Sequence, residues 1–344
     1  MKYITFGEIM IRLKTIGTER LLQSPKLEAT LGGGEANVAV SLANFGLDAA
    51  FVTVLPDNNP LASACLFQLR GFGVDTSMIV RSSYGRMGLY FVEGGANQLP
   101  SKVLYDRANS SISLAPIDCI NWNEVFKNAK WFHLTGITPA ISESAMQLSL
   151  LSVREAHKNG VLVSCDLNYR NKLWKYGKAA PEVMTELMEF VDVLIANEED
   201  VQNSLGIKTD GLNINNIDLS YKRYQELTEL VLQAFPSLSL ISITLRESKN
   251  ANHNSWSACM NNRKRFILSN HYEITNIVDR IGGGDSFSAA LIYGLNTFDS
   301  DEVALNFAVA ASCLKHSISG DFNRVNIQDV LSLMEGNTTG RVKR

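Results

Sequence analysis

The chain has 344 residues, above the length at which single hydrophobic cores usually stop growing, so we expect one large domain or two unequal ones. Hydrophobic residues make up 45% and charged residues 19%, as in a well-packed globular protein, and a net charge of −3 argues against nucleic acid as a main partner. No apolar run approaches bilayer-spanning length and the first residues lack a signal-peptide cleavage region, so we expect a cytoplasmic protein with no membrane partner. The five cysteines are scattered singly and suggest neither disulfides nor a zinc site.

Strand-like apolar runs alternate with helical patterns along most of the chain. The expected strands cover residues 3–7, 49–55, 131–136, 161–167, 192–198 and 238–245. The expected helices lie near residues 36–45, 60–71, 142–158, 180–189, 222–234, 284–296 and 301–316. Strands that are apolar on both faces and separated by helices indicate a parallel sheet covered on both sides, so the sequence predicts a doubly wound α/β fold.

Two stretches, residues 8–31 and 74–113, break this alternation because they contain strand-like runs without helices between them. Ligands of an open α/β sheet bind outside the carboxyl ends of its strands, and a small sheet formed by these two stretches would act there as a lid. The alternative is a pair of surface hairpins with no such role. We expect a single domain over residues 1–335 and a frayed, polar C-terminal tail over 336–344.

A run of three glycines, Gly282 to Gly284, precedes Asp285 and a strongly apolar helical pattern. The first N–H groups of a helix have no partner within it and favour negative charge, and glycines let a ligand approach the backbone closely. This helix start is therefore a candidate anion site, commonly for phosphate. The alternative is a glycine-rich turn in which Asp285 is an ordinary N-cap.

A second glycine-rich helix start contains Gly34 and Asn37. The amide of Asn37 can both donate and accept hydrogen bonds, so it suits a small polar ligand. Glu35, between them, argues against a phosphate and favours a polyol.

Two more polar clusters directly follow apolar strands. Asp166, Asn168 and Arg170 end one strand, and the segment 197–200, Asn-Glu-Glu-Asp, ends the next. A doubly wound fold keeps its site at the carboxyl ends of strands, which favours a functional role for both. Either could instead be a helix start, since asparagine and acidic residues favour first turns.

The chain resembles the ribokinase-like (PfkB) carbohydrate kinases over nearly its whole length. The resemblance is carried by FGEIMIRL, GGGEANVAVSLANFGLDAAFVTVLPDN, DLNYR and VDRIGGGDSFSAALIYGL. Within that family, SKVLYDRANSSIS and LKHSISGDFN are most similar to 2-keto-3-deoxygluconate kinases. The resemblance implies a three-layer α/β/α doubly wound fold, a mostly parallel sheet with a small β-sheet lid, ATP as phosphoryl donor and Mg²⁺, and it allows a monovalent cation.

The resemblance also implies roles for single residues. Gly282, Gly283 and Gly284 would hold the charge that develops on the transferred phosphoryl group, and Asp285 would take the proton from the sugar's primary hydroxyl. The implied substrate contacts are Gly34, Asn37, Tyr90, Tyr105, Arg107, Arg170 and Asp285. The implied nucleotide contacts are Asn168, Thr244, Gly282, Gly284 and His316, and Asn197 and Asp200 would approach Mg²⁺ through water.

Three features depart from the family pattern. Asp200 stands where the family usually has glutamate, which leaves the metal preference open. The segment after Thr244 lacks the glycines that many relatives carry, and Arg12 lies in a region where many ribose and fructose kinases have an aspartate.

The predicted function is ATP-dependent phosphorylation of the primary hydroxyl of 2-keto-3-deoxygluconate, giving 2-keto-3-deoxy-6-phosphogluconate. A substrate carboxylate favours arginine, and Arg107 and Arg170 supply two unless they are surface residues or structural ion pairs. The main alternative is a kinase for a neutral sugar such as fructose or ribose, and a catalytically silent sugar sensor is a further one. Sugar acid and ATP are the expected small-molecule partners, and we expect a homo-oligomer formed through the lid edges.

Overall fold

The computed structural model describes residues 1–208 and 217–337. Most of the tail predicted over residues 336–344 lies outside this part of the chain. Within it, the main sheet has nine strands in the order β14-β13-β12-β11-β10-β9-β1-β4, with β15 beside β13. The strands are β1 (Lys2–Phe6), β4 (Ala49–Val52), β9 (Ala129–Thr135), β10 (Leu162–Asp166), β11 (Val193–Ala196), β12 (Leu240–Asn250), β13 (His253–Asn261), β14 (Phe266–Leu268) and β15 (Tyr272–Ile274).

The sheet is parallel from β4 to β12, and its far edge is antiparallel. β1 pairs in parallel with both β4 and β9, and β10, β11 and β12 continue in the same sense. β13 then runs antiparallel to β12, β14 and β15. The predicted mostly parallel, doubly wound sheet is therefore confirmed, and the antiparallel edge is an addition that the sequence patterns did not indicate.

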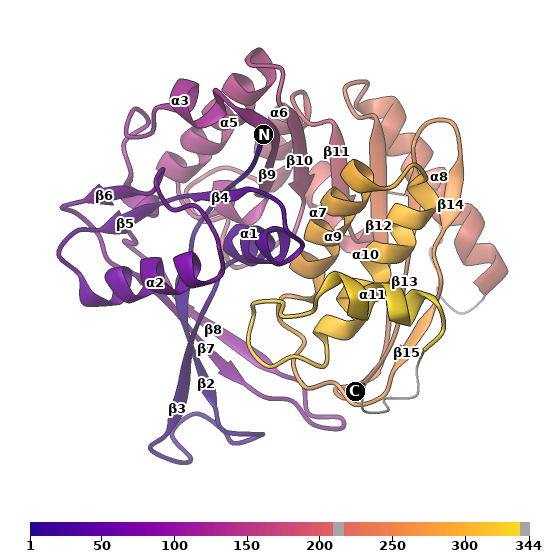
Figure 1. Ribbon diagram of the computed structural model, residues 1–344, viewed down its shortest axis with the longest axis horizontal. Coiled ribbons are helices and arrows are strands. Elements are labelled where there is room, and N and C mark those ends of the chain that lie inside the picture. Colours follow the sequence, from indigo (N-terminus) through magenta and orange to yellow (C-terminus); the bar gives the residue numbers. More distant parts are fainter. Residues whose placement is uncertain (209–216, 338–344) are drawn as a thin grey trace.

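Helices cover both faces of this sheet because successive strand residues point to opposite sides. In β12, Ile241 and Ile243 belong to one buried cluster and Leu240 to another. The first cluster packs against α3 (Trp122–Phe126), α5 (Glu143–Lys158), α6 (Ala180–Met188), α7 (Glu198–Leu205) and α8 (Ile217–Ala234). The second packs against α1 (Gly34–Asn44), α9 (Gly283–Thr297), α10 (Asp301–Lys315) and α11 (Ile327–Met334). Figure 1 shows α9, α10 and α11 together on one face.

The remaining elements lie around these layers. α2 (Pro60–Gly71) packs Ala62 and Leu69 against Phe51 of β4 in a third buried cluster. Two short helices are η1 (Ile112–Leu114) and α4 (Ile137–Ala140). No helix within the described residues is both long and apolar enough to cross a membrane.

A small separate sheet stands off the main body, as the two unusual stretches of sequence predict. Its order is β3-β2-β7-β8, with β2 (Met10–Thr15) and β3 (Leu27–Gly32) from the first stretch and β7 (Gly88–Glu93) and β8 (Lys102–Asp106) from the second. β2 and β7 pair in parallel and join the two stretches (Figure 1). One strand-like run of the second stretch, residues 78–81, does not join this sheet, because β6 (Val80–Ser82) pairs with β5 (Val54–Pro56) in a two-stranded sheet instead.

Candidate active site

The glycine run forms a tight turn at the start of α9. Gly282 is the N-cap and has φ 83°, a left-handed conformation that favours glycine. A side chain at Gly282 would collide with the backbone carbonyl of Asp321, and one at Gly283 would lie 2.9 Å from Cε1 of His316. A side chain at Gly284 would meet no protein atom within 4 Å. The turn is thus packed tightly on one side and open on the other, where a ligand can reach its N–H groups.

Asp285 lies in the first turn of α9 and faces the first turn of α1. Its Oδ2 accepts a hydrogen bond of 2.6 Å from Nδ2 of Asn37, and a side chain at Gly34 would lie 3.5 Å from its Oδ1. The carboxylate is 9% exposed, and burial raises its pKa to about 6, against the lowering effect of the Asn37 hydrogen bond. The two predicted glycine-rich helix starts therefore meet at one carboxylate, which is ionised at neutral pH and can accept a proton.

Two other carboxyl groups, those of Asp166 and Asp200, belong to the same charged cluster as Asp285. Burial, followed by the charges of Asp200 and Asp285, raises the pKa of Asp166 well above its usual range. Burial also raises the pKa of Asp200 to about 6. The guanidinium of Arg170 lowers the pKa of all three carboxyl groups, so this exposed side chain lies near all of them. The cluster retains an excess of negative charge that a bound cation would neutralise.

Asn197 and Asp200 form a capping box at the start of α7. Oδ1 of Asn197 accepts from the N–H of Asp200 at 2.8 Å, and Oδ1 of Asp200 accepts from the N–H of Tyr169 at 3.0 Å. These bonds explain the motif as a helix start, the alternative that the sequence left open. Among the described residues, no group of three or more His, Cys, Asp or Glu side chains forms a metal-binding cluster. An approach to Mg²⁺ through water therefore stays a prediction.

The predicted nucleotide-side residues Asn168 and Thr244 lie on either side of β11, just after β10 ends and just past the parallel pairing of β11 with β12. Asn168 follows β10 with φ 38°, and its N–H donates to Oδ1 of Asp166 at 3.2 Å. Thr244 lies in β12, and its hydroxyl is 3.4 Å from the carbonyl of Ala196, the last residue of β11. Both are half-buried and lie where a doubly wound sheet binds its ligands.

His316, an implied nucleotide contact, lies buried beside Gly283. Its ring is 3% exposed, its Nδ1 lies 2.7 Å from the carbonyl of Ser312, and its centroid lies 5.2 Å from that of Trp256. Burial lowers its pKa to about 4, so the ring is neutral at physiological pH. His316 therefore packs against Gly283 from within the protein. Its direct contact with adenine or ribose stays a prediction.

The predicted substrate residues of the small sheet lie next to one another but already have protein partners. The hydroxyl of Tyr90 donates to Oδ2 of Asp321 at 2.6 Å, and the rings of Tyr90 and Tyr105 are 6.1 Å apart. Arg107 is 7% exposed and forms an ion pair with Glu8, with Nε 2.7 Å from Oε2. The structural ion pair that the sequence left open for Arg107 is therefore present.

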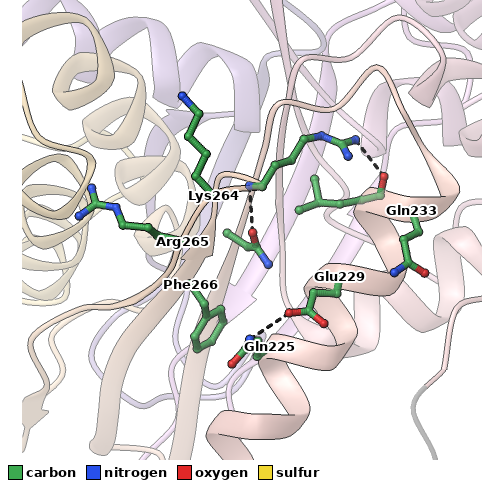
Figure 2. Close-up of a pocket in the computed structure, with 9 residues that line it drawn as sticks. Gln225, Glu229, Gln233, Lys264, Arg265 and Phe266 are labelled. Carbon is green, nitrogen blue, oxygen red and sulfur yellow. Dashed lines mark hydrogen bonds between the residues drawn. The ribbon is translucent and has the colours of Figure 1, made fainter.

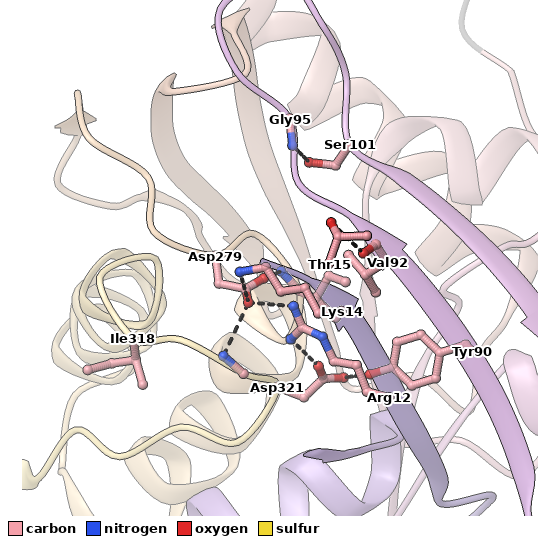
Figure 3. Close-up of polar contacts among 12 residues, drawn as sticks. Arg12, Lys14, Thr15, Tyr90, Val92, Gly95, Ser101, Asp279, Ile318 and Asp321 are labelled. Carbon is pink, nitrogen blue, oxygen red and sulfur yellow. Dashed lines mark hydrogen bonds and ion pairs between the residues drawn. The ribbon is translucent and has the colours of Figure 1, made fainter. Parts of the chain in front are cut away.

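A buried ion network that the sequence analysis missed joins the small sheet to the glycine turn. Arg12 of β2 is 1% exposed and donates to Oδ1 of Asp321 at 2.7 Å and to Oδ2 of Asp279 at 2.6 Å (Figure 3). Lys14 adds a contact of 3.8 Å to Asp279. Tyr90 joins through Asp321, so two strands of the small sheet are fastened to the segments on either side of α9 and α10.

Glu35, which the sequence analysis considered only as a charge beside the polyol site, holds the first turn of α1 to the end of β9. Its Oε1 accepts from the N–H and hydroxyl of Thr135 and from the hydroxyl of Thr138, at 2.7–3.0 Å. Burial raises its pKa to about 7, against these hydrogen bonds. Because three protein groups already donate to the Glu35 carboxylate, its position beside Gly34 suits a structural role.

One pocket, of about 240 Å³, lies at the opposite edge of the sheet. Figure 2 shows it between α8 and the turn before β14, lined among others by Gln225, Glu229 and Lys264. Its lining residue Asn261 pairs with Ile241, near the amino end of β12. The pocket includes none of the predicted site residues and does not belong to the candidate active site.

The site combines an open glycine turn, an adjacent buried carboxylate and polar residues after the strands of a doubly wound sheet, which are parts that phosphoryl transfer to an alcohol group requires. The sequence model of the pfkB family carbohydrate kinases matches residues 2–235. The chain belongs to this family.

Three individual proteins are similar to this chain over nearly its whole length. A 2-dehydro-3-deoxygluconokinase from Thermotoga maritima shares 47% identity over 98% of both chains, with a TM-score of 0.90. A 2-dehydro-3-deoxygalactonokinase from Haloferax volcanii shares 29% identity, again over 98% of both chains. An E. coli protein solved in complex with ATP and Mg²⁺ shares the fold, with a TM-score of 0.78 at 18% identity over 97% of this chain and 99% of that one.

Proposed function

We propose that this kinase uses ATP to phosphorylate the primary hydroxyl of 2-keto-3-deoxygluconate. The observation that carries the choice of substrate is the 47% identity, over 98% of both chains, to the Thermotoga maritima 2-dehydro-3-deoxygluconokinase. The geometry of Asp285 carries the choice of reaction, because a buried carboxylate beside an open glycine turn can accept a hydroxyl proton next to a bound phosphate.

The proposed reaction divides between the two sides of Asp285. On the sugar side, Gly34 leaves room beside the carboxylate and Asn37 orients it by a 2.6 Å hydrogen bond. Asp285 takes the proton as the sugar oxygen attacks the terminal phosphorus of ATP and the bond to the leaving ADP breaks. On the phosphate side, the N–H groups of Gly283 and Gly284 stabilise the charge that develops on the phosphoryl oxygens.

The residues present fit a nucleotide with Mg²⁺. Asp166 lies near both Asp200 and Asp285, whose charges raise its pKa in addition to burial, so a cation close to this group would relieve negative charge. Asn197 and Asp200 would hold Mg²⁺ through water, and Asn168 and Thr244 would contact the nucleotide. When bound, Mg²⁺ would neutralise phosphate charge.

A neutral sugar is the second candidate, and one observation favours it. Arg107 already pairs with Glu8, so part of the charge that would attract a substrate carboxylate is neutralised. Arg170 is exposed, and within the described part of the chain its hydrogen bond goes to the backbone carbonyl of Tyr169 at 2.9 Å. In the proposed function, Arg170 is therefore the arginine more available to a substrate carboxylate, and Arg107 is held more rigidly by Glu8.

The test is kcat/KM for 2-keto-3-deoxygluconate, its galactonate epimer, fructose and ribose, measured by coupled ADP formation. A charge-assisted bond to a carboxylate contributes about 1.5–3 kcal/mol, so the acid should be preferred by about one to two orders of magnitude. Arg170→Ala should reduce that preference mainly through KM, while kcat/KM for a neutral sugar should change little. A parent enzyme that prefers fructose or ribose would refute the proposed substrate but leave the carbohydrate kinase intact.

A further inference from the structure

Lys315, the last residue of α10, is completely buried beneath the glycine turn. Its Nζ donates to three backbone carbonyls, those of Ile281 at 3.0 Å, Ile318 at 3.2 Å and Gly320 at 2.8 Å. An ammonium group has three donors, so these bonds use all of them. Lys315 therefore has no donor left for a ligand, and its effect on one must pass through the backbone that it holds.

The three carbonyls belong to the two segments that shape the anion site. Ile281 directly precedes Gly282, and a side chain at Gly282 would lie 3.3 Å from Cε of Lys315. Gly320 precedes Asp321, whose carbonyl packs against Gly282 on the other side. The ammonium thus ties the turn to the loop that follows α10.

Three carboxylates act on the buried ammonium of Lys315. Asp279, Asp321 and Asp285 each raise the pKa of Lys315, while its burial lowers that pKa more and Arg12 also lowers it. In return, Lys315 lowers the pKa of Asp285. Backbone carbonyl oxygens arranged around a point charge are also the ligands that bind a dehydrated alkali-metal ion in proteins.

We propose that Lys315 is a built-in cation that holds the phosphate-binding turn in its active shape, so that the kinase needs no monovalent metal ion at this position. The proposal rests on the proposed role of Gly282 to Gly284 in binding the transferred phosphoryl group. It makes Lys315 a positioning residue, since all of its hydrogen bonds go to the protein.

The first measurement uses the parent enzyme. Its kcat and its KM for MgATP are determined in buffers whose only monovalent cation is tetramethylammonium, and again with potassium, sodium or ammonium at equal ionic strength. We expect the same values in all four. Strong activation of the parent by potassium or ammonium would overturn the proposal, because it would show that a separate monovalent ion is needed.

The second measurement uses Lys315→Ala, which removes the ammonium and leaves the three carbonyls. Misplacing the turn should lower kcat by about 10²-fold with little change in KM for the sugar. Potassium or ammonium should restore part of kcat and raise the Tm of this variant, whereas tetramethylammonium, which is too large for the carbonyls to surround, should do neither. Lys14→Ala, which removes another lysine beside Asp279, should show no such cation-selective recovery.

The outcomes separate this proposal from the proposed function. A Lys315→Ala variant with the parent's kcat, or one whose kcat and Tm respond equally to all cations, would refute the role of Lys315. A parent that phosphorylates none of the four sugars would refute the proposed function, while the Tm of Lys315→Ala would still report whether the carbonyls select a small cation. If Lys315→Ala does not fold, the cation dependence of the parent decides the matter.

Discussion

The glycine turn can be tested by adding one methyl group at two positions with opposite surroundings. In Gly282→Ala the methyl group would collide with the carbonyl of Asp321, and the residue would need φ near 83°. The left-handed conformation alone costs an alanine about 1–2 kcal/mol, and the collision adds to this. We expect a loss of about 2–4 kcal/mol of stability, seen as a Tm lower by roughly 3–6 °C in a chain of this length.

Gly284→Ala is the matched control for folding and the sharper test of function. Its methyl group would meet no protein atom within 4 Å, and alanine is favoured over glycine in a helix by about 0.5–1 kcal/mol, so its Tm should equal or exceed the parent's. If phosphate oxygens approach the backbone there, the same methyl group would displace them. We then expect kcat/KM for ATP to fall by about 10²-fold or more, since one lost backbone donor has an effect of this size.

The assays are thermal unfolding by circular dichroism and steady-state kinetics with ATP as the varied substrate. The reasoning predicts a stable but inactive Gly284→Ala and an unstable Gly282→Ala. A fully active Gly284→Ala would show that no ligand approaches this glycine closely. A Gly282→Ala as stable as the parent would show that the turn is not fixed by its contact with Asp321.

Three further predictions concern the small sheet and the residues beside it. Arg107→Ala should lower stability by about 3–5 kcal/mol because Glu8 is left buried without its partner. Adding Glu8→Gln to the same chain should recover part of the loss of Tm. An equal loss of Tm in the single and the double variant would mean that the ion pair does not matter. If the small sheet closes over the sugar, substrate with a non-hydrolysable nucleotide should slow amide exchange in β2, β3, β7 and β8, and unchanged exchange rates would count against a lid. Its edge strands β3 and β8 should also pair between subunits, and light scattering that finds a strict monomer would remove that expectation.

The parts of the site that sequence could predict are the local ones. Glycines 282–284 with Asp285, and Gly34 with Asn37, lie within a few residues of a helix start, so the free N–H groups of the first turn indicate ligand sites there, while the roles of the single residues come from the resemblance. The clustering of the polar residues after β10 and β11 could be predicted as well, because parallel strands bring their carboxyl ends to one edge of the sheet. The small sheet was predicted for a related reason, since two stretches lacked the helices found elsewhere.

The missed features depend on residues far apart in the chain. Arg12 and Asp321 are 309 positions apart, and Arg107 and Glu8 are 99 apart, so no local pattern indicates that either pair meets. The family resemblance implies a substrate carboxylate for Arg107, and the alternative of a structural ion pair could not be given a partner because no local pattern points to Glu8. The burial of His316 beside the glycine turn could not be predicted from local pattern either, because only the family resemblance indicates that the two lie close together.

The central claim, that Asp285 is the base of a sugar kinase, is tested most directly by Asp285→Asn. An amide cannot accept the proton, so kcat should fall by about 10²–10⁴-fold while the KM for the sugar changes only a few-fold. Burial raises the pKa of Asp285 to about 6 in the folded protein, above its unfolded value, so the ionised group lowers stability at neutral pH and the neutral variant should fold at least as well as the parent. For the same reason kcat/KM of the parent should decline as the pH falls through about 6, where Asp285 becomes protonated. A well-folded Asp285→Asn that turns over at close to the parent's rate would contradict the account.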